Sequence, residues 1–194
     1  METSEAEFEN AVTIAIDWRD GEALSEAINK CASYCGKEVQ SWEAFPERTF
    51  KFLIELFAQD CIVEFDGAYH LFLIFRHEWS RLSDLQRRKL MSLLNNACTK
   101  PMAAMTRFVI CELLGEFYAN AESLDLLKQF GMMQSEDSRL FVPHGLEHLI
   151  KESSDAGVRA EAADFLATLQ KDRSEKVRLE AIDAAKAIGN PIRK

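Results

Sequence analysis

Two histidines and a glutamate in the C-terminal half have types and spacing that could bind a metal ion. They are His144, Glu147 and His148, within the segment HGLEH. Histidines four positions apart lie on one face of a helix and can share one metal ion. The glutamate beside them could act as a general base on a metal-bound water. The spacing therefore makes His144 and His148 candidate metal ligands.

This H-x-x-E-H spacing resembles the signature of the inverted zinc proteases. Such an enzyme needs a third protein ligand, which we expect downstream among acids such as Glu152, Glu161 or Asp164. Pro143 places His144 in the first turn of its predicted helix, near an end that frays. The chain of 194 residues is also short for a protease of that family. We therefore expect packing or surface histidines here and keep a zinc hydrolase as an alternative.

The remaining polar residues form no catalytic pattern. His70 and His77 lie among aromatic residues, which predicts half-buried, hydrogen-bonded side chains. The only basic run is Arg87, Arg88 and Lys89, and three such residues on an amphipathic helix usually form a solvated face. The sequence has no glycine-rich phosphate loop, nucleophile elbow or cysteine zinc knuckle. We therefore expect no enzyme activity and no cofactor.

Acidic charge is concentrated in the first third of the chain. Residues 1–65 hold 14 acids and 5 bases, whereas residues 66–194 hold 18 of each, so the net charge of −9 lies in the first segment. Such a field favours basic partners and repels nucleic acids and anionic membranes, although a solvated acidic face is the alternative. Two tryptophans beside acids could anchor a partner or fill the core. The predicted partner-binding residues are Trp18, Glu38, Trp42, Glu43 and Glu47.

Helical periodicity runs through most of the chain. A hydrophobic content of 47% with only 8 Gly and 4 Pro favours helices with short connections. The predicted helices cover residues 4–17, 21–35, 46–57, 84–99, 101–119, 121–130 and 143–152. Residues 61–75 are ambiguous because Asp66-Gly67 favours a hairpin, but we prefer a helix over 68–80 since no other segment supplies strands. Gly115 inside its helix is expected to mark a close helix contact.

The last 40 residues contain an internal repeat. Residues 158–169 align without gaps on residues 177–188, an offset of 19, and share Val, Arg, Glu, Ala and Asp. Residues 105–117 contain a fainter copy. The positions that carry the pattern are Asp155, Val158, Arg159, Ala162, Leu166 and Leu169, and then Glu175, Val177, Arg178, Ala181, Ala185 and Ile188.

This pattern resembles the HEAT-type helical repeats, which are also met in armadillo-like solenoids. The resemblance implies stacked helices in which small alanines permit close approach and long aliphatic side chains fill the groove. It also implies a ladder of arginines and acids between repeats, so that Arg159 and Arg178 would hold structure. HEAT units place two helices in ~40 residues, whereas this motif recurs after 19 residues. A regular superhelix and a compact irregular bundle are therefore both allowed.

We expect an all-α fold, an α-α superhelix or irregular HEAT-like domain of about 8–10 helices. One domain is expected over residues 1–194. Within it, acidic helices would cover 1–65, an aromatic-rich middle 66–152 and HEAT-like helices 153–190.

Three functions remain open from the sequence. The favoured one is a non-enzymatic protein-binding module, an adaptor or a toxin-neutralising immunity protein, whose acidic face docks a basic protein. A HEAT-like DNA glycosylase is the second, but it needs a basic groove that this acidic chain lacks. The zinc hydrolase is the third. Because no apolar run approaches the ~20 residues that span a bilayer and the N-terminal residues do not resemble a signal peptide, we expect no membrane contact and a cytoplasmic location.

Overall fold

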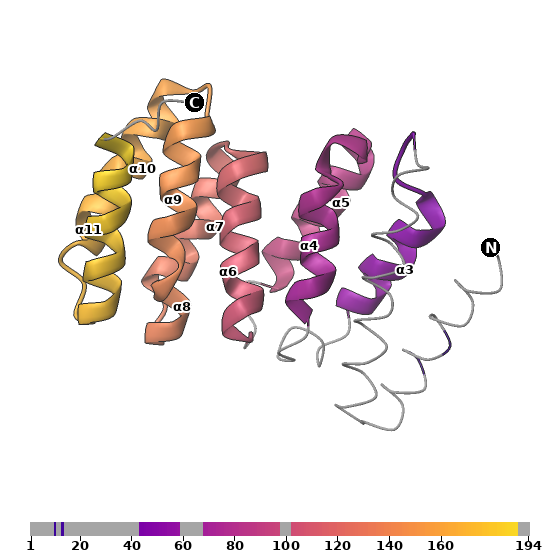
Figure 1. Ribbon diagram of the computed structural model, residues 1–194, viewed down its shortest axis with the longest axis horizontal. Coiled ribbons are helices and arrows are strands. Elements are labelled where there is room, and N and C mark those ends of the chain that lie inside the picture. Colours follow the sequence, from indigo (N-terminus) through magenta and orange to yellow (C-terminus); the bar gives the residue numbers. More distant parts are fainter. Residues whose placement is uncertain (1–9, 11–12, 14–42, 59–67, 98–101, 190–194) are drawn as a thin grey trace. The chain divides into compact units, whose positions relative to one another are not determined.

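The computed structural model describes residues 10, 13, 43–58, 68–97 and 102–189 (Figure 1). Every regular element in these ranges is helical and none is a strand, which confirms an all-α fold. The helices predicted over 4–17 and 21–35 fall outside the described residues, except for positions 10 and 13. The chain divides into two compact units, Met1–Thr106 and Arg107–Lys194. No described helix is both long enough and apolar enough to cross a membrane.

Aromatic side chains form the core of the first unit. Its described elements are α3 (Glu47–Phe57), α4 (Tyr69–His77), the 3-10 turn η3 (Trp79–Arg81) and α5 (Asp84–Ala97). The ring of Phe75 lies 5.8 Å from that of Phe50 and 5.9 Å from that of Phe57, and Phe72 stacks on Phe57 at 4.0 Å. Such ring pairs add to the stabilisation from burial. The preferred helix over 68–80 is confirmed for α4, and residues 61–67 lie outside the described ranges.

Helix α5 begins with a reciprocal cap. The backbone N–H of Ser83 donates to Gln86 Oε1 at 2.9 Å, and the N–H of Gln86 donates to Ser83 Oγ at 3.3 Å. This capping box satisfies two donors at the helix start and confirms the predicted helix start after Ser83. The buried side chain of Gln86 also donates to the carbonyl of Phe45 and to the carboxylate of Glu47. The cap therefore fastens α5 to the beginning of α3.

The second unit consists of two layers of helices. Its elements are α6 (Ala104–Leu113), which enters the unit at Arg107, the π-helical turn η4 (Leu114–Tyr118), α7 (Ala121–Met132), α8 (Glu136–Leu140), α9 (Val142–Glu152), α10 (Ala156–Leu169) and α11 (Glu175–Gly189). Helix α9 lies between η4 and α11, and α7 and α10 pack behind this row (Figure 1). Val142, Leu146 and Leu149 of α9 are fully buried. Helix α9 is therefore the centre of the unit.

Two expected boundaries in this unit are wrong. The predicted helix ends before Gly131 and a loop covers 131–141, whereas α7 runs to Met132 and α8 forms within that range. Gly131 lies inside the helix against Phe165: a Cβ there would lie 2.6 Å from the ring, so the ring would have to shift to accept a side chain. Since α8 precedes α9 directly and Pro143 is buried, His144 does not lie at a frayed end as expected.

Two glycines allow η4 and α9 to approach closely. A Cβ on Gly145 would lie 2.8 Å from the carbonyl oxygen of Cys111 and 2.8 Å from Cδ2 of Leu127. A Cβ on Gly115 would collide with the carbonyl oxygen of Gly145 and lie 2.9 Å from Cβ of His148. Only residues without a side chain permit such an approach. The close helix contact predicted at Gly115 is therefore confirmed.

Replacing Gly115 by alanine should destabilise the second unit. The added methyl group has no space at the crossing, and overpacking of this kind costs about 1–3 kcal/mol even though alanine favours the helix itself. We expect a net loss of about 1–2 kcal/mol in the free energy of unfolding, measured by urea denaturation. Gly189→Ala is the matched control, because a Cβ at Gly189 would meet nothing within 4 Å. Equal stabilities of the two variants would contradict a tight crossing.

Candidate functional site

The crossing of η4 and α9 gathers one glutamate and two histidines. Glu112, His144 and His148 are the one set of three His, Cys, Asp or Glu side chains among the described residues that could hold a metal ion, and their ligand atoms all lie within 4.8 Å of one another. The Nε2 atom of His144 lies 3.3 Å from Oε1 of Glu112. Glu112 precedes Gly115 by one helical turn, and the histidines lie on either side of Gly145. The approach of the two glycines therefore brings the three side chains together.

Aromatic rings hold His144 in place. The ring of Phe108 stacks on it at 5.2 Å with an interplanar angle of 13°, and Phe141 packs edge-on against Phe108 at 5.3 Å. The ring of His148 meets that of His144 edge-on at 4.7 Å. The side chain of His144 is 31% exposed and that of Glu112 is 12% exposed. One side of the cluster is therefore open to water, so an ion can enter from solution.

The charge state of His148 follows from its surroundings. Burial lowers the pKa of His148 below its usual value, and the neighbouring His144 acts in the same direction. The carboxylates of Glu116, Glu147 and Glu112 oppose this shift. A lowered pKa keeps the imidazole neutral at neutral pH, which is the form that binds a metal ion.

Two imidazoles and one carboxylate are a donor set that zinc prefers. Ligand atoms around a tetrahedral zinc ion lie about 3.3 Å apart, because each bond measures roughly 2.0–2.1 Å. The His144 and Glu112 atoms already have this separation, at 3.3 Å. The ligand atom of His148 lies within 4.8 Å of the other two, so a closer approach of its ring would complete a three-ligand site with a fourth position for water. The same donors also accept other divalent transition metals.

Glu147 occupies a different place from the one that the H-x-x-E-H spacing suggests. Its carboxylate accepts a hydrogen bond from Lys151 Nζ at 2.6 Å and lies 3.9 Å from Nδ1 of His144. This nitrogen is the one on the far side of the ring from Glu112. A carboxylate hydrogen-bonded behind a ligating histidine fixes the tautomer and the ring orientation, and Glu147 would have to approach closer than 3.9 Å to form that bond. The position of Glu147 therefore suits an outer partner of His144, whereas a general base would face the bound water.

The third candidate ligand lies upstream of the histidines and is missing from the sequence-based prediction. The expected downstream acid Glu161 instead pairs with Lys128. Glu112 comes from α6, 32 residues before His144. The signal in the sequence was Gly115, which predicted a close helix contact but not the helix that makes it.

The predicted partner-binding face lies largely outside the described residues. This applies to Trp18, Glu38 and Trp42, while Glu43 and Glu47 are described and exposed. Glu47 lies 3.5 Å from Lys89 in an ion pair. An acidic docking face therefore stays a prediction.

The other two histidines differ from each other. His70 is partly buried against the ring of Tyr69, at a centroid distance of 3.9 Å, and burial lowers its pKa. The half-buried state predicted for both is confirmed for His70 and is wrong for His77. His77 is the last residue of α4, and its side chain is exposed to solvent.

The repeat arginines bind backbone carbonyls in the connections between helices. Arg159 donates to the carbonyl of Ser153 at 2.8 Å, and Arg178 donates to that of Asp172 at 2.8 Å, each six residues earlier. The resemblance to HEAT repeats implies that these arginines pair with acidic side chains, whereas the hydrogen bonds observed here are to backbone carbonyls. The repeat positions Val158, Ala162, Val177 and Ala181 are buried, and Asp155 caps α10 by accepting from the N–H groups of Gly157 and Val158.

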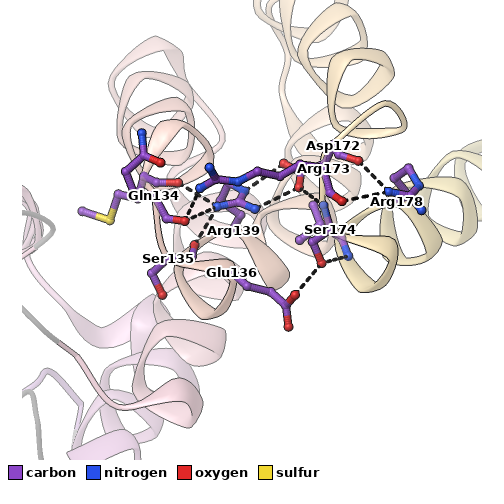
Figure 2. Close-up of polar contacts among 10 residues, drawn as sticks. Gln134, Ser135, Glu136, Arg139, Asp172, Arg173, Ser174 and Arg178 are labelled. Atoms are coloured by element: carbon purple, nitrogen blue, oxygen red, sulfur yellow. Dashed lines mark hydrogen bonds and ion pairs between the residues drawn. The ribbon is translucent and has the colours of Figure 1, made fainter.

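Arg139 repeats this arrangement and adds a buried ion pair, as Figure 2 shows. Its Nη1 donates to the carbonyls of Met133, Gln134 and Ser135 at 2.9, 2.8 and 3.0 Å. Its Nε and Nη2 donate to the two carboxylate oxygens of Asp172 at 2.8 and 2.9 Å. The side chains are only 4% and 10% exposed, so the α7–α8 connection is tied firmly to the α10–α11 connection.

This ion pair should give the second unit a defined acid sensitivity. The hydrogen bond from Arg139 lowers the pKa of Asp172 below its usual value. A carboxyl whose pKa is lower in the folded state contributes stability above its unfolded pKa and loses it as pH falls through the folded value. The contribution should therefore be complete at pH 5 and above and decline below about pH 4.

Asp172→Asn should lower the free energy of unfolding by about 2 kcal/mol at pH 7, because buried Arg139 loses its countercharge. The difference from the wild type should shrink below about pH 4 in urea titrations. Asp183→Asn is the matched control, since the Asp183–Lys186 pair is 72% and 67% exposed and such pairs contribute little. A pH-independent difference would contradict the assigned role of the carboxylate.

Comparisons with known proteins assign the chain to no family. No protein-family model matches it, and neither a curated protein nor a solved structure does. The Glu112, His144 and His148 cluster is therefore interpreted from its own geometry and chemistry.

Proposed function

We propose that the protein is a non-enzymatic helical module whose second unit binds one divalent transition-metal ion, with zinc as the preferred ion, through Glu112, His144 and His148. The observation that carries the proposal is the placement of three suitable ligand atoms within 4.8 Å of one another on two different helices. A carboxylate and two imidazoles at this spacing form a three-ligand site.

A metal ion at this place would act as a clamp. Glu112 comes from the end of α6, which continues into η4, and both histidines come from α9. One ion would therefore join α9 to the α6–η4 segment that it approaches at Gly115 and Gly145. Because α9 also packs against α7, α10 and α11, fixing its contact with η4 would stabilise the whole unit. The engagement of Glu147 with Lys151 at 2.6 Å favours this structural role over the hydrolytic alternative.

The arrangement of the second unit supports a HEAT-like interpretation of its fold. Its helices form two layers, and Arg139, Arg159 and Arg178 make the same contact with a carbonyl six residues earlier. Stacked helices of this kind present broad surfaces to protein partners. The acidic surplus of residues 1–65 favours a basic protein as that partner.

Metal binding can be measured directly on the full chain. After treatment with a chelator, calorimetric titration with zinc should give one ion per chain. Zinc at 100 times its dissociation constant should stabilise the second unit by about 2.7 kcal/mol, which corresponds to a rise of roughly 10 °C or more in its thermal midpoint. Cobalt bound at the site should show the visible absorption of a four-coordinate ion.

Two substitutions identify the ligands. His148→Ala and Glu112→Gln should each lower zinc affinity at least tenfold, whereas His77→Ala, which changes an exposed histidine in the first unit, should leave it unchanged. The absence of stoichiometric zinc binding by the wild type would refute the proposed function. Equal affinities in the wild type and His148→Ala would place the ion elsewhere.

The role of Glu147 separates the clamp from the hydrolase. An outer partner of a ligating histidine contributes about 10- to 100-fold to metal affinity, so Glu147→Gln should weaken zinc binding by about tenfold. A general base would instead leave zinc affinity unchanged and abolish hydrolysis. Unaltered affinity combined with loss of a zinc-dependent peptidase activity of the wild type would favour the hydrolase. Lys151→Gln serves as the matched control for loss of the Glu147–Lys151 ion pair alone.

A further inference from the structure

The outer face of α11 carries a stripe of exposed residues with an unusual order. Glu175, Leu179, Ile182 and Lys186 follow one another at spacings of four, three and four residues, which places them on one side of a helix. Leu179 is 54% exposed and Ile182 is 38% exposed. Two large aliphatic side chains thus lie in water between an acid and a base.

The stripe points away from the rest of the second unit. The buried residues of α11 are Val177, Ala181 and Ala184, and they face α8, α9 and α10, the elements that α11 contacts. At ~100° per residue, the stripe lies on the side of the helix opposite to these three residues. Figure 1 draws α11 at the end of the row of helices that contains α9. No other described helix of the unit covers the stripe.

The order of the four side chains makes the stripe complementary to itself. When two copies of α11 lie antiparallel about a two-fold axis midway between Leu179 and Ile182, Leu179 of each copy meets Ile182 of the other. In the same arrangement Glu175 of each copy meets Lys186 of the other. An isologous interface requires a patch that matches its own rotated copy, and the 4-3-4 spacing is that of two helices packed side by side.

We infer that the outer face of α11 is a homodimer interface, with a second copy of this chain as its occupant. The two central aliphatic pairs supply apolar burial and the two outer ion pairs set the antiparallel direction. Lys186 already pairs with Asp183 at 2.8 Å, but both side chains are mostly exposed and can exchange partners at little cost. A contact of one helix with another is a small interface, so the dimer is weak and depends on concentration.

Sedimentation equilibrium of the full chain tests this interface. The measurement uses low salt, a chelator to remove any metal-mediated contact, and chain concentrations from about 10 μM to about 1 mM. The wild type should pass from monomer to dimer in this range. Glu175→Lys and Lys186→Glu each turn both outer ion pairs into repulsions and should each raise the dissociation constant about tenfold or more.

Combining the two charge reversals gives the sharpest result. The double variant restores both ion pairs with opposite polarity and should dimerise as the wild type does. An equimolar mixture of the two single variants should form heterodimers, because every contact in the mixed pair joins opposite charges. Glu180→Lys makes the same charge change on an exposed residue outside the stripe and should not affect dimerisation, and circular dichroism checks the helix content of each variant. A wild type that stays monomeric at about 1 mM, or single variants that dimerise like it, would overturn the inference.

Discussion

The approach of two backbones at Gly115 and Gly145 is the constraint on which the arrangement of the second unit depends. Because neither position has room for a Cβ, the distance between η4 and α9 is set by main-chain atoms, which leave little freedom to adjust. The π-helical turn η4 lies at the same place and is followed by Ala119, whose N–H donates to the carbonyl of Leu114 at 3.0 Å. Ala119 has φ of 23°, a conformation that costs energy for a residue with a side chain. The strained residue is thus next to the elements that hold Glu112 and the two histidines.

Local sequence patterns predicted where most of the described helices lie. They did not predict which helices pack against one another. The cap at Ser83, the proline at the start of α9 and the helical pattern of α5 depend on residues a few positions apart, and the sequence displays them. Gly131 was predicted to end a helix, but it lies inside α7 and packs against Phe165 of another helix. The sequence does not show that contact. Glu112 was missed for the same reason: periodicity places it on α6 but does not say which helix crosses there.

Two groups of charged side chains in the second unit differ in what they contact. Arg139, Arg159 and Arg178 donate hydrogen bonds to backbone carbonyls that have no partner within a helix. Asp172 forms an ion pair with Arg139, the most buried of the three. Glu112, His144 and His148 instead contact one another at a surface open to water. The arginines stabilise the connections between helices because their donors are bonded to the backbone. The side chains of the cluster face one another and solvent, so they can release a proton and bind a metal ion instead.

The contact between an arginine and the carbonyl six residues before it makes the connections between these helices local in sequence. The donor and the acceptor of each contact lie within seven consecutive residues, as in Ser153 to Arg159 and Asp172 to Arg178. Each of these two connections between helices is therefore held by a contact within its own short stretch of chain, and the carboxylate of Asp172 adds a longer-range contact to Arg139. The 19-residue offset between the two similar segments also separates Arg159 from Arg178 and Ser153 from Asp172, so the two connections have the same internal spacing.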